Sequence, residues 1–197
     1  MDADQVTALR IMLGSSTWLE RTREFARALR GRPARSVGGL LLVGTPDEEP
    51  WHLAAHLDQE SRQAGIPELA PTLVRWAPPP GAPSHLRVGL SRLEEARRGE
   101  TLLIVSPDAA PPPLLERVQG ARQVGATILA MDQGDPELDS LAHEYLSVTP
   151  GHAPVSFDAA QHLVSAASAE PLQSRAGLRI RLARLLDAVS GPAAADS

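Results

Sequence analysis

The chain has 197 residues, of which 43% are hydrophobic, and it carries a formal net charge of −5 at pH 7. This length suits one domain with a substantial core, and the hydrophobic content excludes a disordered protein. The negative charge argues against nucleic-acid binding, and an aromatic content of 3% leaves few side chains for stacking on bases.

Cys, Lys and Asn are absent, and the absence of the first two removes classes of chemistry. Without Cys there is no disulfide, thiolate nucleophile or cysteine metal site, and without Lys there is no Schiff-base or P-loop lysine. No apolar run approaches the roughly twenty residues that cross a bilayer, and the start, MDADQVTALR, does not read as a signal segment. We therefore expect a cytoplasmic protein with no membrane span, no nucleic-acid partner and no cofactor.

Apolar residues at helical spacing alternate along the chain with short runs of branched residues. Helices are predicted over 3–30 (with a break at 14–16, after which Thr17 starts a second segment), 51–63, 85–98, 111–124, 136–143, 156–169 and 174–189. Strands are predicted over 38–44, 72–76, 101–105, 126–131 and 144–148. This alternation predicts a three-layer α/β/α sandwich around a five-stranded parallel sheet of flavodoxin-like topology.

The predicted organisation has four parts: N-terminal helices in residues 1–36, the α/β domain in 37–170, a C-terminal helix in 171–190 and a disordered tail in 191–197. The most informative part is residues 99–132, a strand, loop, helix and strand typical of a right-handed parallel crossover. Ligands bind beyond the carboxyl ends of such strands. Those ends carry Ser106, Asp108 and Asp132, and Thr45 follows the first strand, so these four residues are the candidate ligand-binding residues.

The order of elements resembles the SIS (sugar isomerase) domain family. The segment GETLLIVS at 99–106 is similar to the family's glycine-to-serine strand, LLERVQGARQVGATI at 114–128 to its helix and next strand, and LDSLAHEYLSV at 138–148 to its last strand. LVG at 42–44, followed by HLAAHL at 52–57, resembles the phosphoheptose isomerase branch. The resemblance implies a helix-flanked parallel sheet, a homodimer and a sugar-derived ligand.

The chain departs from the family's phosphate-binding loops. Where active members carry hydroxyl residues after the third strand, this chain reads SPDAAP at 106–111, and its prolines remove amide donors. The first loop, TPDEEP at 45–50, adds three acids. A site lined by Asp47, Glu48, Glu49 and Asp108 should repel a phosphosugar.

The family's catalytic base does not carry over cleanly. If His52 aligns with the branch's histidine, His56 stands where the branch has its catalytic glutamate, and a neutral histidine can still act as a base. His52 and His56 also share a helix face, which would allow a metal site with an acid from the first loop, although ordinary surface histidines are the simpler interpretation. Asp108 and Asp132 could likewise bind Mg²⁺, but helix capping is the favoured role, and Asp135 before Pro136 fits it best.

Two hypotheses about function remain open. The leading one is an SIS-like protein that has lost isomerase activity and acts as a binding, regulatory or assembly module, with a protein partner docking on its N-terminal or C-terminal helices. The alternative is an isomerase or other enzyme on sugar derivatives that uses an altered site, with His52 or His56 as the base.

Overall fold

The computed structural model describes residues 17–31 and 39–169. The predicted helices before residue 17 and after residue 169 therefore lie outside the described residues, as does the predicted tail at 191–197. Within the described ranges, five parallel strands form one sheet in the order β2-β1-β3-β4-β5, which is the predicted flavodoxin-like order. The strands are β1 (Leu40–Val43), β2 (Pro71–Val74), β3 (Thr101–Ser106), β4 (Thr127–Asp132) and β5 (Glu144–Ser147).

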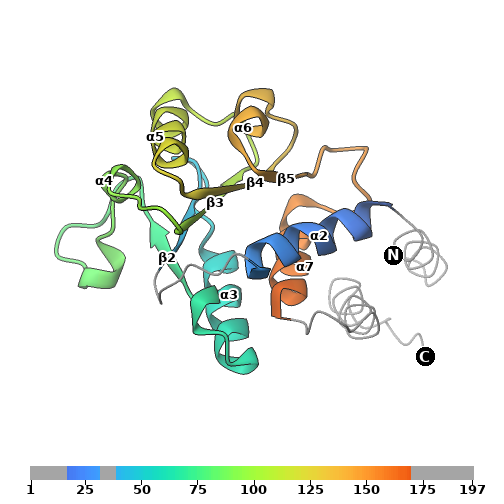
Figure 1. Cartoon of the computed structure of the whole chain (residues 1–197), viewed down its shortest axis with the longest axis horizontal. Helices are drawn as coiled ribbons and strands as arrows, with labels where there is room; N and C mark the ends of the chain where they lie inside the picture. The colour runs from blue at the N-terminus through green and yellow to red at the C-terminus, as the bar shows by residue number, and fades with distance from the viewer. Residues whose placement is uncertain (1–16, 32–38, 170–197) are drawn as a thin grey trace, which may run out of the picture.

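Helices cover both faces of this sheet, as the sequence predicts (Figure 1). One face carries α2 (Thr17–Gly31), α3 (Trp51–Ala64) and α7 (Phe157–Ala169). The other carries α4 (Ser91–Glu94), α5 (Pro112–Gln123) and α6 (Pro136–Leu141). The structure therefore confirms the three-layer sandwich.

Each central strand supplies both halves of the core because successive side chains point to opposite faces. In β3, Leu103 and Val105 pack toward α2, α3 and α7, whereas Leu102 and Ile104 pack toward α4, α5 and α6. All six residues of β3 are buried. The strands therefore read as unbroken apolar runs in the sequence, which is typical of a parallel sheet covered on both faces.

One predicted element is wrong. Residues 85–98 do not form a single helix; two short turns, η2 (Ser84–Leu86) and α4, flank an extended stretch. The backbone N–H of Arg75 donates to the carbonyl of Val88 at 2.8 Å, and Arg75 pairs with Gly89 as an isolated parallel bridge. This tertiary pairing extends the sheet edge beyond β2 and competes with a helix through the same residues.

Glycine residues end two of the helices as predicted. Gly65 follows α3 with φ of 66°, and its N–H donates to the carbonyl of Ser61. Gly125 follows α5 with φ of 92°, and its N–H donates to the carbonyl of Arg122 at 3.0 Å. Both conformations lie in the left-handed region that favours glycine, so these positions stop the helices and turn the chain into the next element.

None of the described helices combines the length and the apolarity that crossing a membrane requires.

Candidate functional site

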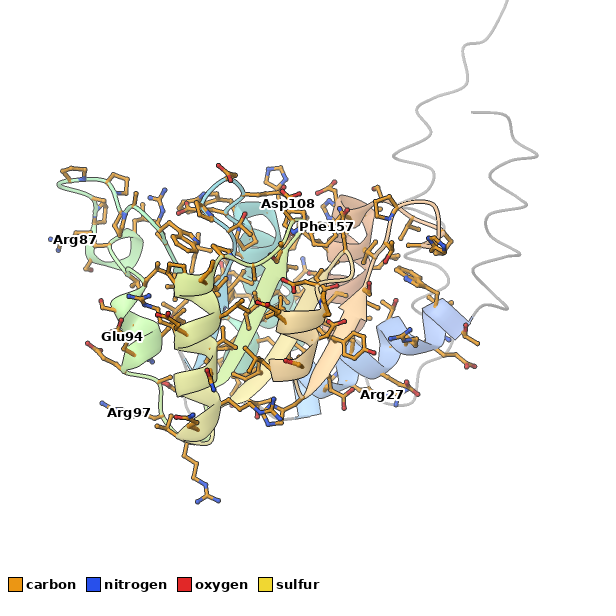
Figure 2. The ribbon with its side chains drawn as sticks, turned by 90° about the horizontal axis from the view of Figure 1, so that it is seen from above. Arg27, Arg87, Glu94, Arg97, Asp108 and Phe157 are labelled. Atoms are coloured by element: carbon orange, nitrogen blue, oxygen red, sulfur yellow. The ribbon has the colours of Figure 1, made fainter. Side chains whose placement is uncertain are left out.

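The carboxyl ends of the central strands bring the predicted site residues to one edge of the sheet. Val43 of β1 is level with Ile104 of β3, and Ser106 of β3 is level with Asp132 of β4. Thr45, two residues beyond Val43, therefore continues the same row. Asp108, labelled in Figure 2, lies at this end of the sheet, opposite the end that carries Arg97.

The loop after β1 is closed on itself. The Thr45 N–H donates to the Glu48 carbonyl at 3.1 Å, and the Thr45 hydroxyl accepts from the Glu48 N–H at 3.2 Å. A methyl group added at Gly44 would lie 2.2 Å from the Glu48 carbonyl oxygen and 2.6 Å from Pro50 Cδ. The loop backbone thus packs directly against Gly44, while the Asp47 and Glu48 side chains are exposed.

Glu49 points toward the carboxyl end of β2, on the side of β1 opposite β3. Its carboxylate accepts from Arg75 Nε at 2.9 Å, from the Trp51 indole N–H at 3.0 Å and from the Trp76 backbone N–H at 3.2 Å. Arg75 Nη2 also lies 2.9 Å from the same carboxylate. The predicted line of four acids around the site is therefore divided, because Glu49 is neutralised by Arg75.

The loop after β3 offers few donors to an anion. Ser106 is completely buried, and its hydroxyl donates to the carbonyl of Asp108 at 2.6 Å, while the Asp108 side chain is exposed. Helix α5 then begins with Pro112 and Pro113 after Pro111 at the N-cap position. The next N–H, that of Leu114, donates to the Pro111 carbonyl at 2.8 Å. The usual anion-binding start of a helix is therefore missing from residues 111–114.

Asp132, at the end of β4, is completely buried. Its Oδ1 accepts from the Gly134 N–H at 2.7 Å, so it stabilises the turn after the strand and does not cap a helix as predicted. Its Oδ2 and the Oδ1 of Asp139 on α6 are both buried and receive no hydrogen bond from donors of the described residues. Burial, the hydrogen bond to Asp132 and the charge of Asp132 raise the pKa of Asp139 to about 7. Below about pH 7, Asp139 thus keeps a proton that it can share with Asp132.

Asp135 caps α6, as the sequence predicts. Its Oδ1 accepts from the N–H groups of Glu137 and Leu138 at 3.0 and 3.2 Å. Its Oδ2 accepts from the N–H of Ala110 at 2.7 Å, which ties the loop after β4 to the loop after β3. This second contact leaves the Ala110 amide already bonded within the chain.

The two candidate histidines lie on α3, and they differ in environment. His52 is exposed, whereas the ring of His56 packs edge-on against that of His162 on α7, with ring centres 4.4 Å apart. Burial and then the neighbouring His162 and His52 lower the pKa of His56, against the opposing charges of Glu60 and Asp158. In the ranges 17–31 and 39–169, no three His, Asp or Glu side chains are grouped to hold a metal ion.

Three residues that contact the candidate site residues or their loops were not predicted from the sequence: Arg75, Asp139 and His162. Arg75 binds Glu49 in the loop between β1 and α3, Asp139 interacts with Asp132 at the end of β4, and His162 packs against His56 on α3. Each pair joins two different elements or loops. Arg75 lies near the carboxyl end of the predicted strand at 72–76, and this position was the one signal that could have marked it.

No protein-family model and no curated protein matches the chain, but solved structures match its fold. A candidate phosphosugar isomerase from Silicibacter pomeroyi DSS-3 superposes with a TM-score of 0.59 at 16% identity, covering 93% of this chain and 52% of that one. A candidate sugar-binding protein from Salmonella typhimurium LT2 gives 0.56 at 18% identity, with the same coverage. The sugar isomerase domain of the RpiR transcription factor from Sphaerobacter thermophilus gives 0.53 at 20% identity, covering 94% of each chain.

The chain has the fold of a sugar isomerase domain. It spans about half of the length of the first two proteins and nearly all of the isolated domain from Sphaerobacter thermophilus. At these levels of identity the likeness concerns the fold, so the site of this sugar isomerase fold has to be interpreted from its own residues.

Proposed function

We propose that this chain is a sugar isomerase domain that has lost isomerase activity and acts as a binding, regulatory or assembly module. The observation that carries the proposal is the start of α5, where Pro111, Pro112 and Pro113 remove three successive amide donors. Phosphate binding at a helix start depends on such donors and on the local helix dipole. A distant kinship with the phosphoheptose isomerase branch is part of the proposal, carried by the sequence resemblance.

The hydroxyl groups next to these amides support the same conclusion. Thr45 and Ser106 stand at neighbouring strand ends, but the Thr45 hydroxyl accepts within its own loop and the Ser106 hydroxyl donates to the Asp108 carbonyl. A ligand would have to break these local hydrogen bonds, each worth about 1 kcal/mol net, before it gained its own.

Exposed acids add an electrostatic obstacle. Asp47, Glu48 and Asp108 are exposed on the loops that follow β1 and β3. Two like unit charges about 4 Å apart repel by roughly 1 kcal/mol in water and about 4 kcal/mol near a protein surface. A sugar-derived ligand between the loops after β1 and β3 would therefore be neutral or cationic, and a phosphate dianion there would be disfavoured.

The proposed module is a cytoplasmic homodimer, with further protein partners docking through the N-terminal or C-terminal helical segments. Support comes from the sequence, which places amphipathic segments on both sides of the α/β domain. Size-exclusion chromatography with light scattering checks the dimer. A monomer at micromolar concentration would contradict this part of the proposal.

The binding test is thermal unfolding of the full chain with a panel of phosphosugars and their unphosphorylated counterparts. A ligand at a hundredfold excess over its Kd adds about 2.7 kcal/mol to the free energy of unfolding, which is easily measured. We expect no stabilisation by a phosphosugar beyond that of its unphosphorylated counterpart. The matched variant is D108S/P112A/P113A, which removes one acid and restores two N–H groups, and we expect it to gain measurable phosphate binding.

Two results would overturn the loss of the phosphate site. One is a phosphosugar that stabilises the unchanged chain when its unphosphorylated counterpart does not. The other is a D108S/P112A/P113A variant that folds and still shows no response to phosphate, because the missing donors would then not be the reason for the loss.

The second candidate function is isomerase chemistry with His56 as the base. Its support is the lowered pKa of His56, which keeps this imidazole neutral and able to accept a proton at pH 7. A coupled assay of aldose–ketose interconversion tests it, with H56Q as the variant and H152Q, in an exposed loop, as the control. Turnover that H56Q abolishes and H152Q preserves would establish this function in place of the first.

A further inference from the structure

The cluster of Glu49, Trp51, Arg75 and Trp76, here called the Glu49 cluster, has the composition of an anion-binding site. Four nitrogens converge on one carboxylate: Arg75 Nε and Nη2, each at 2.9 Å, and the Trp51 indole N–H at 3.0 Å lie on Oε2, and the Trp76 N–H at 3.2 Å lies on Oε1. Arg75 therefore serves one carboxylate oxygen and the backbone N–H of Trp76 serves the other, so both oxygens of a bound carboxylate have a donor.

We propose that these donors form a binding site for the carboxylate of a small acid, and that Glu49 closes the site as a built-in ligand. An external carboxylate would take the place of the Glu49 side chain on Arg75 and release the loop of residues 45–50. The site lies beyond the ends of β1 and β2, apart from the disabled helix start at α5, so the inference does not rest on the proposed function.

The anchoring of the donors supports a site that persists without Glu49. Arg75 directly follows β2, its N–H is bonded to Val88, and its guanidinium lies over the Trp51 ring with 4.5 Å to the centre. The Trp76 indole N–H donates to the Gly44 carbonyl at 2.8 Å, which ties this segment to the end of β1. These contacts hold the backbone of Arg75 and the side chain of Trp76 independently of Glu49, and the Trp51 ring supports the guanidinium.

The exposure of the cluster indicates the size of the ligand. The Arg75 and Glu49 side chains are only 15% and 14% exposed, so access is too narrow for a flat protein surface. Trp51, in contrast, is 39% exposed beside them. A slender acid could therefore place its carboxylate on Arg75 and lay its carbon chain against the indole ring, which is why we choose a small molecule.

Competition with Glu49 is the basis of the test. The E49A variant of the full chain removes the internal carboxylate and leaves the four donors, so it should bind acetate and gluconate at least about tenfold more tightly than the unchanged chain. Isothermal titration and tryptophan fluorescence measure this, since two of the three tryptophans of the chain belong to the cluster. Chloride at the same ionic strength controls for screening.

Three comparisons make the result decisive. E49A/R75A should lose the response to carboxylates, and E49Q, which keeps the size of the side chain, serves if E49A does not fold. Binding of inorganic phosphate but not of acetate would overturn the choice of a carboxylate.

If neither E49A nor E49Q binds acetate more tightly than the unchanged chain, Glu49 and Arg75 form a structural ion pair and the proposal fails. Stabilisation by a phosphosugar that persists in R75A would bear on the proposed function and not on this site.

Discussion

The carboxylate of Asp135 accepts a hydrogen bond of 2.7 Å from the N–H of Ala110, a residue 25 positions earlier in the chain. The same side chain caps α6 through Glu137 and Leu138. One aspartate thus holds the start of a helix and joins the loops after β3 and β4, and the first of these loops borders the β1/β3 switch point where ligands bind in this topology.

Replacing Asp135 should therefore cost more than the loss of an ordinary cap. We expect D135A to lower the free energy of unfolding by about 2–3 kcal/mol, since it removes a helix cap and leaves the Ala110 N–H without its acceptor. The stability of D135N should lie between that of D135A and that of the unchanged chain, because its one remaining oxygen can serve either the helix or Ala110. Urea unfolding monitored by circular dichroism measures both variants. A loss in D135A no larger than the roughly 1 kcal/mol of an ordinary cap would show that the bond to Ala110 contributes nothing.

The shared proton of Asp132 and Asp139 should make stability depend on pH. The pKa of Asp139 is raised to about 7, so between pH 4 and pH 7 the folded chain keeps a proton that the unfolded chain has lost. The contribution of this pair to the free energy of unfolding therefore falls as pH rises through this range and is constant above it. Asp135 raises the pKa further and Arg21 opposes the shift.

The D139N variant tests this dependence. Its amide can donate to Asp132 at every pH, so we expect D139N to exceed the unchanged chain at pH 8 by about 1–2 kcal/mol, a figure reduced for the solvent screening of the partly exposed Asp139. The advantage should shrink toward pH 4. E137Q, on the exposed side of the same helix, is the matched control. A constant difference between D139N and the unchanged chain at all pH values would contradict the shared proton.

The sheet could be predicted from the sequence because its strands are buried on both faces. Branched apolar runs such as residues 101–105 leave few alternatives once the flanking turns are assigned. The helix ends at Gly65 and Gly125 and the cap at Asp135 were predictable for a similar reason, since each depends on residues next to it in the chain. Local chemistry decided these features.

The parts that could not be predicted depend on contacts between distant residues. The segment at 85–98 has the composition of a helix, yet the bond from Arg75 to Val88 holds part of it extended. Glu49 is the last of three consecutive acids in the sequence. Only the fold shows that Arg75, 26 positions later, binds it and turns it away from the other two. Likewise, nothing in the chain order indicates that Asp139 faces Asp132.

Gly44 should be intolerant of a side chain because of the closed first loop. A methyl group there would lie 2.2 Å from the Glu48 carbonyl oxygen, and backbone atoms at this distance must move. We expect G44A to lower the free energy of unfolding by about 2–3 kcal/mol and to change tryptophan fluorescence, since the Glu49 cluster depends on this loop. Chemical denaturation gives the first value and emission spectra the second.

The matched control for Gly44 is Gly120, which lies on the exposed face of α5 with open space around it. G120A should raise the free energy of unfolding by about 0.5–1 kcal/mol, as expected for glycine in a helix interior. If G44A is as stable as the unchanged chain while G120A behaves as expected, the loop at 45–50 is open in solution.

His56 should make the chain sensitive to acid, in the direction opposite to Asp139. Its pKa is lowered, mainly by burial and then by His162 and His52, so below about pH 6.5 the unfolded chain takes up a proton that the folded chain resists. The contribution of His56 to the free energy of unfolding is therefore present above pH 6.5 and is lost as pH falls.

The H56L variant should remove this acid-dependent loss of stability. Thermal unfolding at pH 5.5 and 7.5 measures the loss for H56L, for the unchanged chain and for H152Q as control. The contribution of Asp139 cancels in the comparison because the two sites share no partner. If H56L and the unchanged chain lose equal stability between the two pH values, the packing of His56 against His162 does not resist protonation, and the physical basis for a neutral base at this position is removed.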